Sequence, residues 1–331
     1  MSSATDQHSP AESTAAGAVE HPSGAALTTV PLGERLSVVL LTYNCGHRLQ
    51  PVLDALATLD VPIIAVDNAS VDDTADVLER QRGVEVVRLP SNTGAAGRNV
   101  GAQRVRTPYV AFCDDDGWYE RAGLELACDL FDQHLDLDLV NARILVGEEE
   151  RLDPISAEMA DSPLTDHQGL PGTVLLSFKG GAVVVRRSAY QEVQGYDPRF
   201  FMGGEEETLS FKLAKRGSAM RYVPEVVMHH HPSRANAASL RAFGMRNTLW
   251  NAWLHRPLRS ALRWTAFTLA DTPKNRDFAA GLWMALRGMG WVLRERSPMD
   301  AGLDRELSEL DARRFATRRP FLTTRGWRPP S

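Results

Sequence analysis

Residues 37–113 alternate between short apolar runs and segments with helical periodicity, and this alternation restricts the fold more than any other feature of the chain. Four segments have the character of strands: Ser37–Leu41, Pro62–Val66, Val84–Arg88 and Tyr109–Cys113. Ser37–Leu41 is a continuous apolar run, which is typical of a strand covered on both faces. The order of strands and helices predicts an α/β fold with a mostly parallel central sheet.

The fourth apolar run stops at three adjacent aspartates, Asp114, Asp115 and Asp116. Like charges this close repel unless water or a cation compensates them. At the carboxyl end of a strand they face the crevice where α/β proteins bind ligands. Because side chains alternate along a strand, Asp114 and Asp116 share one side, which suits a hard divalent cation. A solvated acidic turn is the alternative.

Polar residues also follow the other three strands, so all four strand ends are expected to meet in one crevice. They are Thr42, Tyr43 and Asn44 after the first strand, Asp67 and Asn68 after the second, and Asn92 and Gly94 after the third. An aromatic ring, an amide, a single carboxylate and a metal pair together suit a nucleoside diphosphate. For Asp67 and Asn68, turn and helix-capping contacts are an equal alternative.

The segment Asn92–Gly101 is glycine-rich and opens a helix. It matches neither GxGxxG, which would also follow the first strand, nor GxxxxGK[ST], so nicotinamide cofactors and P-loop nucleotide binding are excluded. Arg98 could neutralise diphosphate charge or be an ordinary solvated arginine.

Two further clusters carry possible chemistry. Glu205, Glu206 and Glu207 begin a helix, where carboxylates favour the dipole, but three exceed what capping needs, so one is expected to act as a general base. The run His229-His230-His231 ends a strand and is a candidate for metal binding, with His230 pointing away from its two neighbours.

The 331 residues carry a formal net charge of −5, which argues against broad nucleic-acid binding. Three cysteines without metal-site spacing suggest free thiols in a reducing, cytoplasmic compartment. No signal peptide and no membrane-spanning run is recognisable.

The predicted organisation is a disordered tail at 1–33, a catalytic domain at 34–235, a helical region at 236–300 and an Arg-rich tail of uncertain order at 301–331.

The C-terminal part differs in charge from the rest. From residue 241 onward there are 17 Lys/Arg and 8 Asp/Glu, and six of the seven tryptophans lie there: Trp250, Trp253, Trp264, Trp283, Trp291 and Trp327. Tryptophan with arginine favours the surface of an anionic membrane, so peripheral contact with the inner face of the cell membrane is expected. A helical subdomain with tryptophans in its core is the alternative.

These motifs in their order resemble the family 2 glycosyltransferases of the GT-A fold, particularly the rhamnosyltransferase-like and galactofuranosyltransferase-like members. The resemblance rests on SVVLLTYN (37–44), VDNASVDDT (66–74), NTGAAGRNVG (92–101), VAFCDDD (110–116), KGGAVVVRRSAYQEVQGYDPRFF (179–201), GEEETLSFKLAKRG (204–217) and PEVVMHHHPS (224–233). It implies a Rossmann-like nucleotide-diphospho-sugar transferase fold and an inverting sugar transfer to an acceptor hydroxyl in bacterial cell-surface glycan or glycolipid synthesis.

The resemblance also implies roles for single residues. A UDP- or dTDP-linked sugar is expected at the donor side, which comprises Thr42, Tyr43, Asn44, Asp67, Asn92, Gly94, Arg98, Asp114 and Asp115. Asp114, Asp116 and His230 (or His229 or His231) would bind Mg²⁺ or Mn²⁺. Glu206 occupies the position of the family's catalytic aspartate, with Glu205 as the alternative base. Lys179, Gly180 and Gly181 would face a glycan or lipid-linked acceptor.

Two other functions fit parts of the pattern. A nucleotidyltransferase that makes nucleotide sugars also uses carboxylates and a metal, but TYNCGHR (42–48) is a poor match to its usual glycine-rich, basic loop. A non-catalytic sugar-nucleotide or glycan-binding protein would not need the acidic and histidine clusters.

Overall fold

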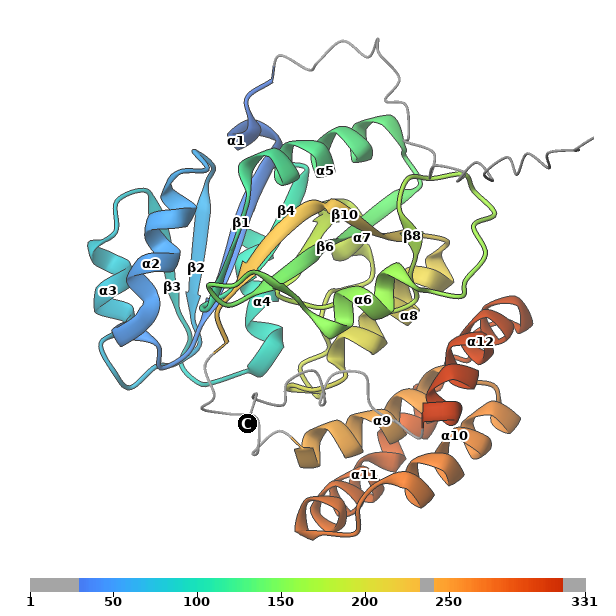
Figure 1. Cartoon of the computed structure of the whole chain (residues 1–331). Helices are drawn as coiled ribbons and strands as arrows, with labels where there is room; N and C mark the ends of the chain where they lie inside the picture. Colours follow the sequence, from blue (N-terminus) through green and yellow to red (C-terminus); the bar gives the residue numbers. More distant parts are fainter. Residues whose placement is uncertain (1–29, 233–240, 318–331) are drawn as a thin grey trace, which may run out of the picture.

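The computed structural model describes residues 30–232 and 241–317. A ten-stranded sheet lies between helices on both faces, and four C-terminal helices form a separate group beside it (Figure 1). Helix α1 (Leu32–Arg35) precedes the sheet, and its Leu32 is buried. Most of the predicted disordered tail, residues 1–29, lies outside the described residues.

The predicted parallel strands form one half of the sheet, in the order β3-β2-β1-β4. They are β1 (Leu36–Thr42), β2 (Ile63–Asp67), β3 (Val84–Arg88) and β4 (Tyr109–Asp114), joined by α2 (Gly46–Ala57), α3 (Thr74–Arg80), the short η1 (Gly94–Ala96) and α4 (Gly97–Arg104). In register, Thr42 lies opposite Asp67 and Leu41 opposite Asp114. The carboxyl ends of these strands therefore meet at one edge, as the alternation predicts.

The other half of the sheet is mixed. Strand β9 (Ala182–Arg186) runs antiparallel to both β4 and β6 (Leu137–Val146), β10 (Ala219–His230) runs parallel to β6, and β5 (Gly117–Tyr119) runs antiparallel to β10. The small strands β7 (Arg151–Leu152) and β8 (Thr173–Val174) pair with β6 and β10. Helices α5 (Arg121–Gln133), α7 (Arg187–Glu192) and α8 (Glu205–Arg216) complete this half.

Two segments of this half contain prolines within or at the start of regular structure. Residues 219–230 form one strand, β10, whose register shifts between Val223 and Val227. Pro224 lies in this irregular stretch, where a residue without an N–H can be tolerated within a strand. Between β7 and β8, Pro154 begins helix α6 (Pro154–Ala160), and the Asp153 side chain caps this helix by accepting a hydrogen bond from the Ile155 N–H.

The apolar core has one cluster on each face of the sheet. Along β1, Val38 and Leu40 pack into one cluster, while Val39 and Leu41 pack into the other. This arrangement explains why the strand is apolar at every position instead of at alternate positions.

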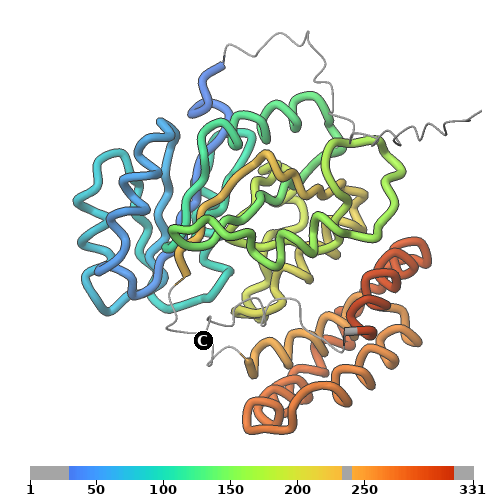
Figure 2. The backbone as a smooth tube through the Cα atoms, in the orientation of Figure 1, coloured from blue at the N-terminus to red at the C-terminus, as the bar shows by residue number. Residues whose placement is uncertain are grey.

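The C-terminal helices are α9 (Arg241–His255), α10 (Leu258–Asp271), α11 (Arg276–Arg294) and α12 (Ala301–Thr317). Helix α9 lies against α8, α10 and α11. A third core joins Phe200, which precedes α8, to Trp250 of α9 and residues of α11. The chain trace shows this group at one side of the sheet, next to the segment that leads into α8 (Figure 2). Residues 301–317 of the predicted tail are thus helical, and 318–331 lie outside the described residues.

Candidate active site

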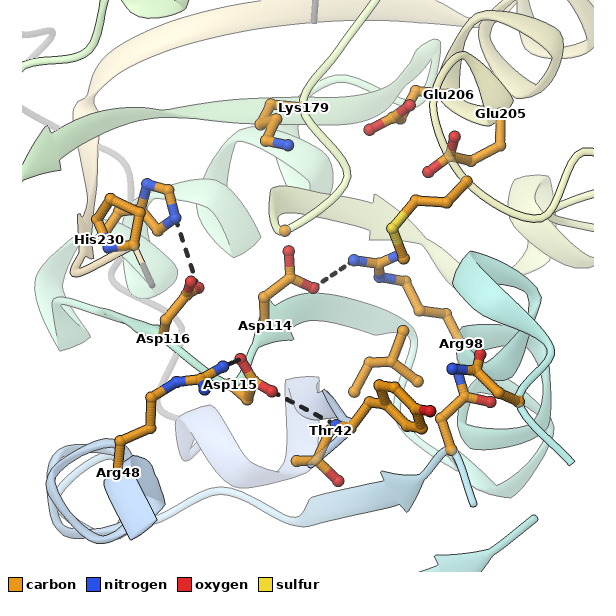
Figure 3. Close-up of a pocket in the computed structure, with 17 residues that line it drawn as sticks. Thr42, Arg48, Arg98, Asp114, Asp115, Asp116, Lys179, Glu205, Glu206 and His230 are labelled. Carbon is orange, nitrogen blue, oxygen red and sulfur yellow. Dashed lines mark hydrogen bonds and ion pairs between the residues drawn. The ribbon is translucent and has the colours of Figure 1, made fainter. Parts of the chain in front are cut away.

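A cavity of about 360 Å³ opens at the carboxyl ends of the parallel strands (Figure 3). Most of the predicted site residues line it: Thr42, Tyr43, Asn92, Arg98, Asp114, Asp115, Asp116, Lys179, Gly181, Glu205, Glu206 and His230. Residues of β1, β4 and β10, of the segments beside β3 and β9, of α4 and of the start of α8 therefore meet at one place, although they are up to 188 positions apart in the sequence, from Thr42 to His230.

Each of the three adjacent aspartates has a different basic partner (Figure 3). Asp114 pairs with Arg98, Asp115 accepts a hydrogen bond of 2.7 Å from Nη2 of Arg48, and Asp116 lies 3.4 Å from Nε2 of His230. Burial acts to raise the pKa of Asp116, but the hydrogen bond and charge of His230 outweigh it and hold that pKa below its usual value. The repulsion predicted from the sequence is thus compensated residue by residue.

Glu205 and Glu206 lie at the N-terminus of α8 and face the cavity from the side opposite the aspartates (Figure 3). Both are buried, and Oε2 of each is a buried atom without a hydrogen-bond partner within the described chain. Burial and the charge of Glu206 raise the pKa of Glu205 well above its usual value. Two buried carboxyl groups this close therefore disfavour a negative charge on both at once.

Glu207 differs from the other two glutamates. Its Oε2 accepts a hydrogen bond of 3.1 Å from Nδ2 of Asn251, and its Oε1 lies 3.6 Å from Nη1 of Arg314. These contacts tie it to α9 and α12, and it is not part of the cavity wall. Of the three-glutamate run, only the first two are in a position to act on a ligand.

The predicted acceptor-side residues join the two acidic clusters. A Cβ on Gly181 would lie 2.3 Å from Oδ2 of Asp114, and one on Gly180 would lie 2.9 Å from Oη of Tyr196 and 3.4 Å from Oε1 of Glu206. Only glycine fits this approach. Burial alone would lower the pKa of Lys179, but the charges of Glu206, Asp114 and Glu205 outweigh it and raise that pKa, so the cation persists between the clusters.

Three predicted donor residues and Gly180 lie behind the cavity wall instead of in it. Asn44 accepts from the Val71 N–H, and Asp67 from the Ser70 N–H, so both fix the turns after β1 and β2. Gly94 has a φ of +61°, and a Cβ there would lie 2.1 Å from the Phe201 carbonyl oxygen. Asn68, which does line the cavity, donates to Gly94 O. The turn contacts proposed as an alternative for Asp67 and Asn68 are thus present.

The three consecutive histidines are separated by strand geometry. His230 faces the cavity, while the rings of His229 and His231 stack on Trp118 at 5.6 and 4.9 Å between centroids. The main chain fixes this arrangement, because the His231 N–H donates to Asp116 O at 2.6 Å and His230 pairs with Gly117.

The three-ligand metal set predicted from the sequence is not assembled. Asp114 is directed to Arg98, away from His230, and among residues 30–232 and 241–317 no three His, Cys, Asp or Glu side chains are grouped so that they could hold an ion. Asp116 and His230 remain a two-residue oxygen and nitrogen set that faces the cavity. Such a partial set fits Mg²⁺ or Mn²⁺ that takes its other ligands from water and substrate phosphates.

The sequence interpretation missed Arg48, Met202 and Pro232, which also line the cavity. Arg48 had a detectable signal, since it lies in the first turn of the helix after β1, where ligand-binding residues gather. Met202 and Pro232 had none, because their positions depend on how loops return to the sheet edge.

The raised pKa of Glu205 predicts a measurable effect of pH on stability. Above the ordinary value of 4.5 the unfolded chain loses this proton while the folded protein keeps it, so the free energy of unfolding falls as pH rises. We expect Glu205→Gln to remove this decrease in the free energy of unfolding. The melting temperature of the variant should therefore decline less steeply than that of the wild type between about pH 5 and 8. Glu79→Gln, an exposed change on α3, is the control, and parallel curves for Glu205→Gln and wild type would contradict the assignment.

Comparisons with known proteins agree with this geometry. Residues 37–194 match the family described as Glycosyl transferase family 2. The chain is 28% identical over 207 residues to a pre-mycofactocin glycosyltransferase of Mycobacterium tuberculosis, which covers 61% of this chain and 44% of that protein. It is 37% identical over 95 residues to an N-acetylglucosaminyl-diphospho-decaprenol L-rhamnosyltransferase of the same organism, which covers 26% of this chain and 31% of that protein. The chain thus spans less than half the length of these relatives.

Solved structures show the same fold at low identity. The crystal structure of S. aureus TarS 1-349 in complex with UDP-GlcNAc superposes with a TM-score of 0.55 and 15% identity, over 86% of this chain and 88% of that one. GalNAc-T7 with UDP, GalNAc and Mn²⁺ also gives a TM-score of 0.55, at 14% identity, over 79% of this chain and 56% of that one. From its motifs, its fold and the match over residues 37–194, this part of the chain is similar to glycosyl transferase family 2, and the chain has the GT-A fold.

Proposed function

We propose that this chain transfers a sugar from a nucleotide diphosphate to an acceptor hydroxyl, with inversion at the anomeric carbon. The observation that carries the proposal is the pair of buried glutamates, Glu205 and Glu206, across one cavity from the aspartates at the end of β4. A single displacement needs a base on one side of the sugar and charge compensation for the leaving group on the other.

The donor nucleoside is placed at the ends of β1 and β2. Tyr43 is half-exposed at the cavity and offers a ring for stacking, and the Asp67 carboxylate lies directly behind this part of the wall. The diphosphate then extends toward Asp116 and His230. Arg98 lies beside it and can bind phosphate oxygens if its pairing with Asp114 loosens.

Glu206 is proposed as the base, because it lines the cavity beside Gly180 on the proposed acceptor side and occupies the position that the resemblance assigns to the catalytic aspartate. Glu206 takes the proton of the acceptor hydroxyl, and the oxygen bonds to the anomeric carbon. The bond from that carbon to the diphosphate breaks on the opposite face, and the nucleoside diphosphate leaves with the electron pair. Mg²⁺ or Mn²⁺ held by Asp116 and His230 would offset the charge on that leaving group.

The alternative of a nucleotidyltransferase is less well supported by the site. Its chemistry takes place at a phosphorus atom, and it has no need of a buried carboxyl pair at the far side of the cavity from the diphosphate position. A non-catalytic binding protein would also gain nothing from Glu205 and Glu206, because burying two carboxyl groups side by side destabilises the fold.

The acceptor is proposed to be lipid-linked, with the C-terminal helices in contact with the membrane. No helix within the described ranges is long and apolar enough to cross a bilayer. Most of the tryptophans cannot support this contact, because Trp250 and Trp264 are buried and Trp253 and Trp291 are half-buried. Trp283 is 61% exposed, and Trp327 lies outside the described residues.

The surface that supports membrane contact is instead formed by exposed apolar residues on two helices. Leu258 and Leu262 of α10 and Trp283, Leu286 and Leu293 of α11 are each at least half exposed, and we call them the α10/α11 face. The exposed arginines Arg259, Arg263, Arg287 and Arg294 lie on the same two helices. Apolar side chains flanked by arginine match an anionic lipid surface, where each basic residue contributes about 1 kcal/mol.

Metal dependence is the first kinetic prediction. Asp116→Ala should abolish nucleotide release from a panel of UDP- and dTDP-sugars in the presence of Mn²⁺ and should weaken UDP binding, because the proposed cation loses its only carboxylate ligand. Asp76→Ala, an exposed change on α3, should leave both unchanged. Wild-type activity that persists in excess EDTA would rule out the metal assignment.

The base assignment predicts a second kinetic result. Glu206→Gln keeps the shape of the side chain and removes the proton acceptor, so turnover should fall by roughly 10²–10⁴-fold while the affinity for UDP stays near that of the wild type. Glu205→Gln should retain far more turnover. If Glu205→Gln is inactive and Glu206→Gln is not, the two roles are exchanged.

Membrane contact is tested by sedimentation with vesicles at low salt. The full chain should pellet with vesicles containing phosphatidylglycerol but not with phosphatidylcholine alone, and the double change Trp283→Ser with Leu286→Ser should release it. Val71→Ser, which alters an apolar side chain exposed elsewhere on the surface, is the matched control. A wild-type protein that stays in the supernatant with anionic vesicles would refute the contact and remove the argument for a lipid-linked acceptor.

A further inference from the structure

The segment that leads into the glutamate pair has an unusual backbone. Phe201, Gly203 and Gly204 have φ values of +62°, +83° and +98°, in the left-handed region. Gly204 is the N-cap residue of α8, and no side chain caps the helix there. Residues 200–204, which we call the 200–204 loop, form no regular hydrogen-bond ladder, so their buried carbonyl oxygens need partners from elsewhere in the chain.

Two asparagines of α9 supply those partners. Nδ2 of Asn247 donates to the carbonyl oxygens of Phe200, Met202 and Gly203 at 2.9, 3.1 and 2.8 Å. Nδ2 of Asn251 donates to Gly204 O at 2.8 Å, and its Oδ1 accepts a hydrogen bond from Thr208 in the first turn of α8. Both side chains are fully buried.

The opposite side of the 200–204 loop contacts the donor side of the cavity. Phe201 O accepts a hydrogen bond of 2.8 Å from the Ala95 N–H, in the short helix that follows Gly94. The 200–204 loop is therefore held between α9 on one side and the glycine-rich segment on the other. Glu205 and Glu206 follow directly, so their position in the cavity depends on both contacts.

We infer that Asn247 and Asn251 are positioning residues for the proposed catalytic base, and that the C-terminal helices are therefore part of the catalytic unit. This inference rests on the proposed function. Both asparagines lie beyond the family match, which ends at residue 194. Neither asparagine contacts the proposed metal ligands or the proposed donor-binding residues. Their hydrogen bonds instead set where the first turn of α8 begins. A displacement of about 1 Å at a catalytic group can reduce turnover roughly 10²-fold.

The test compares three substitutions of the same type within the helical region. Asn247→Ala and Asn251→Ala remove the bonds to the 200–204 loop. Asn275→Ala is the control. Asn275 caps α11 by accepting a hydrogen bond from the Phe278 N–H, and it neither lines the cavity nor contacts the 200–204 loop. Each variant is measured for hydrogen exchange of residues 200–210, for UDP affinity with Mn²⁺ and for nucleotide release from the nucleotide-sugar panel.

We expect Asn247→Ala and Asn251→Ala to speed exchange in 200–210 and to lower kcat by about 10²-fold with UDP affinity within a few fold of wild type. Asn275→Ala should change neither. Exchange and kcat equal to those of Asn275→Ala would overturn the inference, as would a loss confined to UDP affinity. If the wild type releases no nucleotide from any sugar, the proposed function fails, and the exchange comparison still decides whether the asparagines position α8.

Discussion

The structure depends on the compensation of negative charge in one cavity. Asp114, Asp115, Asp116, Glu205 and Glu206 face a space of about 360 Å³, and Arg48, Arg98, Lys179 and His230 are distributed among them. Carboxylates placed this close would repel one another without such partners. The compensation is local for the aspartates, each with its own basic partner, and incomplete for the glutamates, whose Oε2 atoms have no partner in the described chain. In the proposed mechanism, this imbalance separates the side that binds the diphosphate from the side that accepts a proton.

Much of this cavity could be predicted from the sequence, because local signals placed its residues at element ends. The alternation of residues 37–113 predicted the parallel half of the sheet, and the abrupt end of β4 placed Asp114–Asp116 at its edge. Strand alternation separated His230 from its neighbours. Contacts between distant segments could not be predicted: Arg98 takes Asp114 away from the expected metal set, and Pro224 interrupts the pattern of β10 without ending the strand. The sequence also left open whether the tryptophans of α9 and α10 lie at the surface or in a core, since composition does not reveal which side of a helix is covered.

The C-terminal helices connect two parts of the proposed function. The inner side of α9 holds the 200–204 loop through Asn247 and Asn251, and α10 and α11 pack on α9 while the residues of the α10/α11 face stay exposed. In the proposed mechanism, these helices both position the Glu206 carboxylate and bring the cavity to the membrane surface where a lipid-linked acceptor would lie. The buried ion pair of Arg256 with Asp311 ties α12 to the end of α9, and Arg314 of α12 reaches Glu207. These helices are therefore joined to α8 at several points.

The central claim is that this cavity binds a nucleoside diphosphate between the two acidic clusters. A crystal structure of the wild-type chain grown with UDP and Mn²⁺ tests it most directly. The account predicts the uracil ring against Tyr43 near the ends of β1 and β2, the diphosphate beside Asp116 and His230 with the cation between them, and Glu206 facing the position where a sugar would extend. A nucleotide bound elsewhere, or a cation that contacts neither Asp116 nor His230, would contradict it.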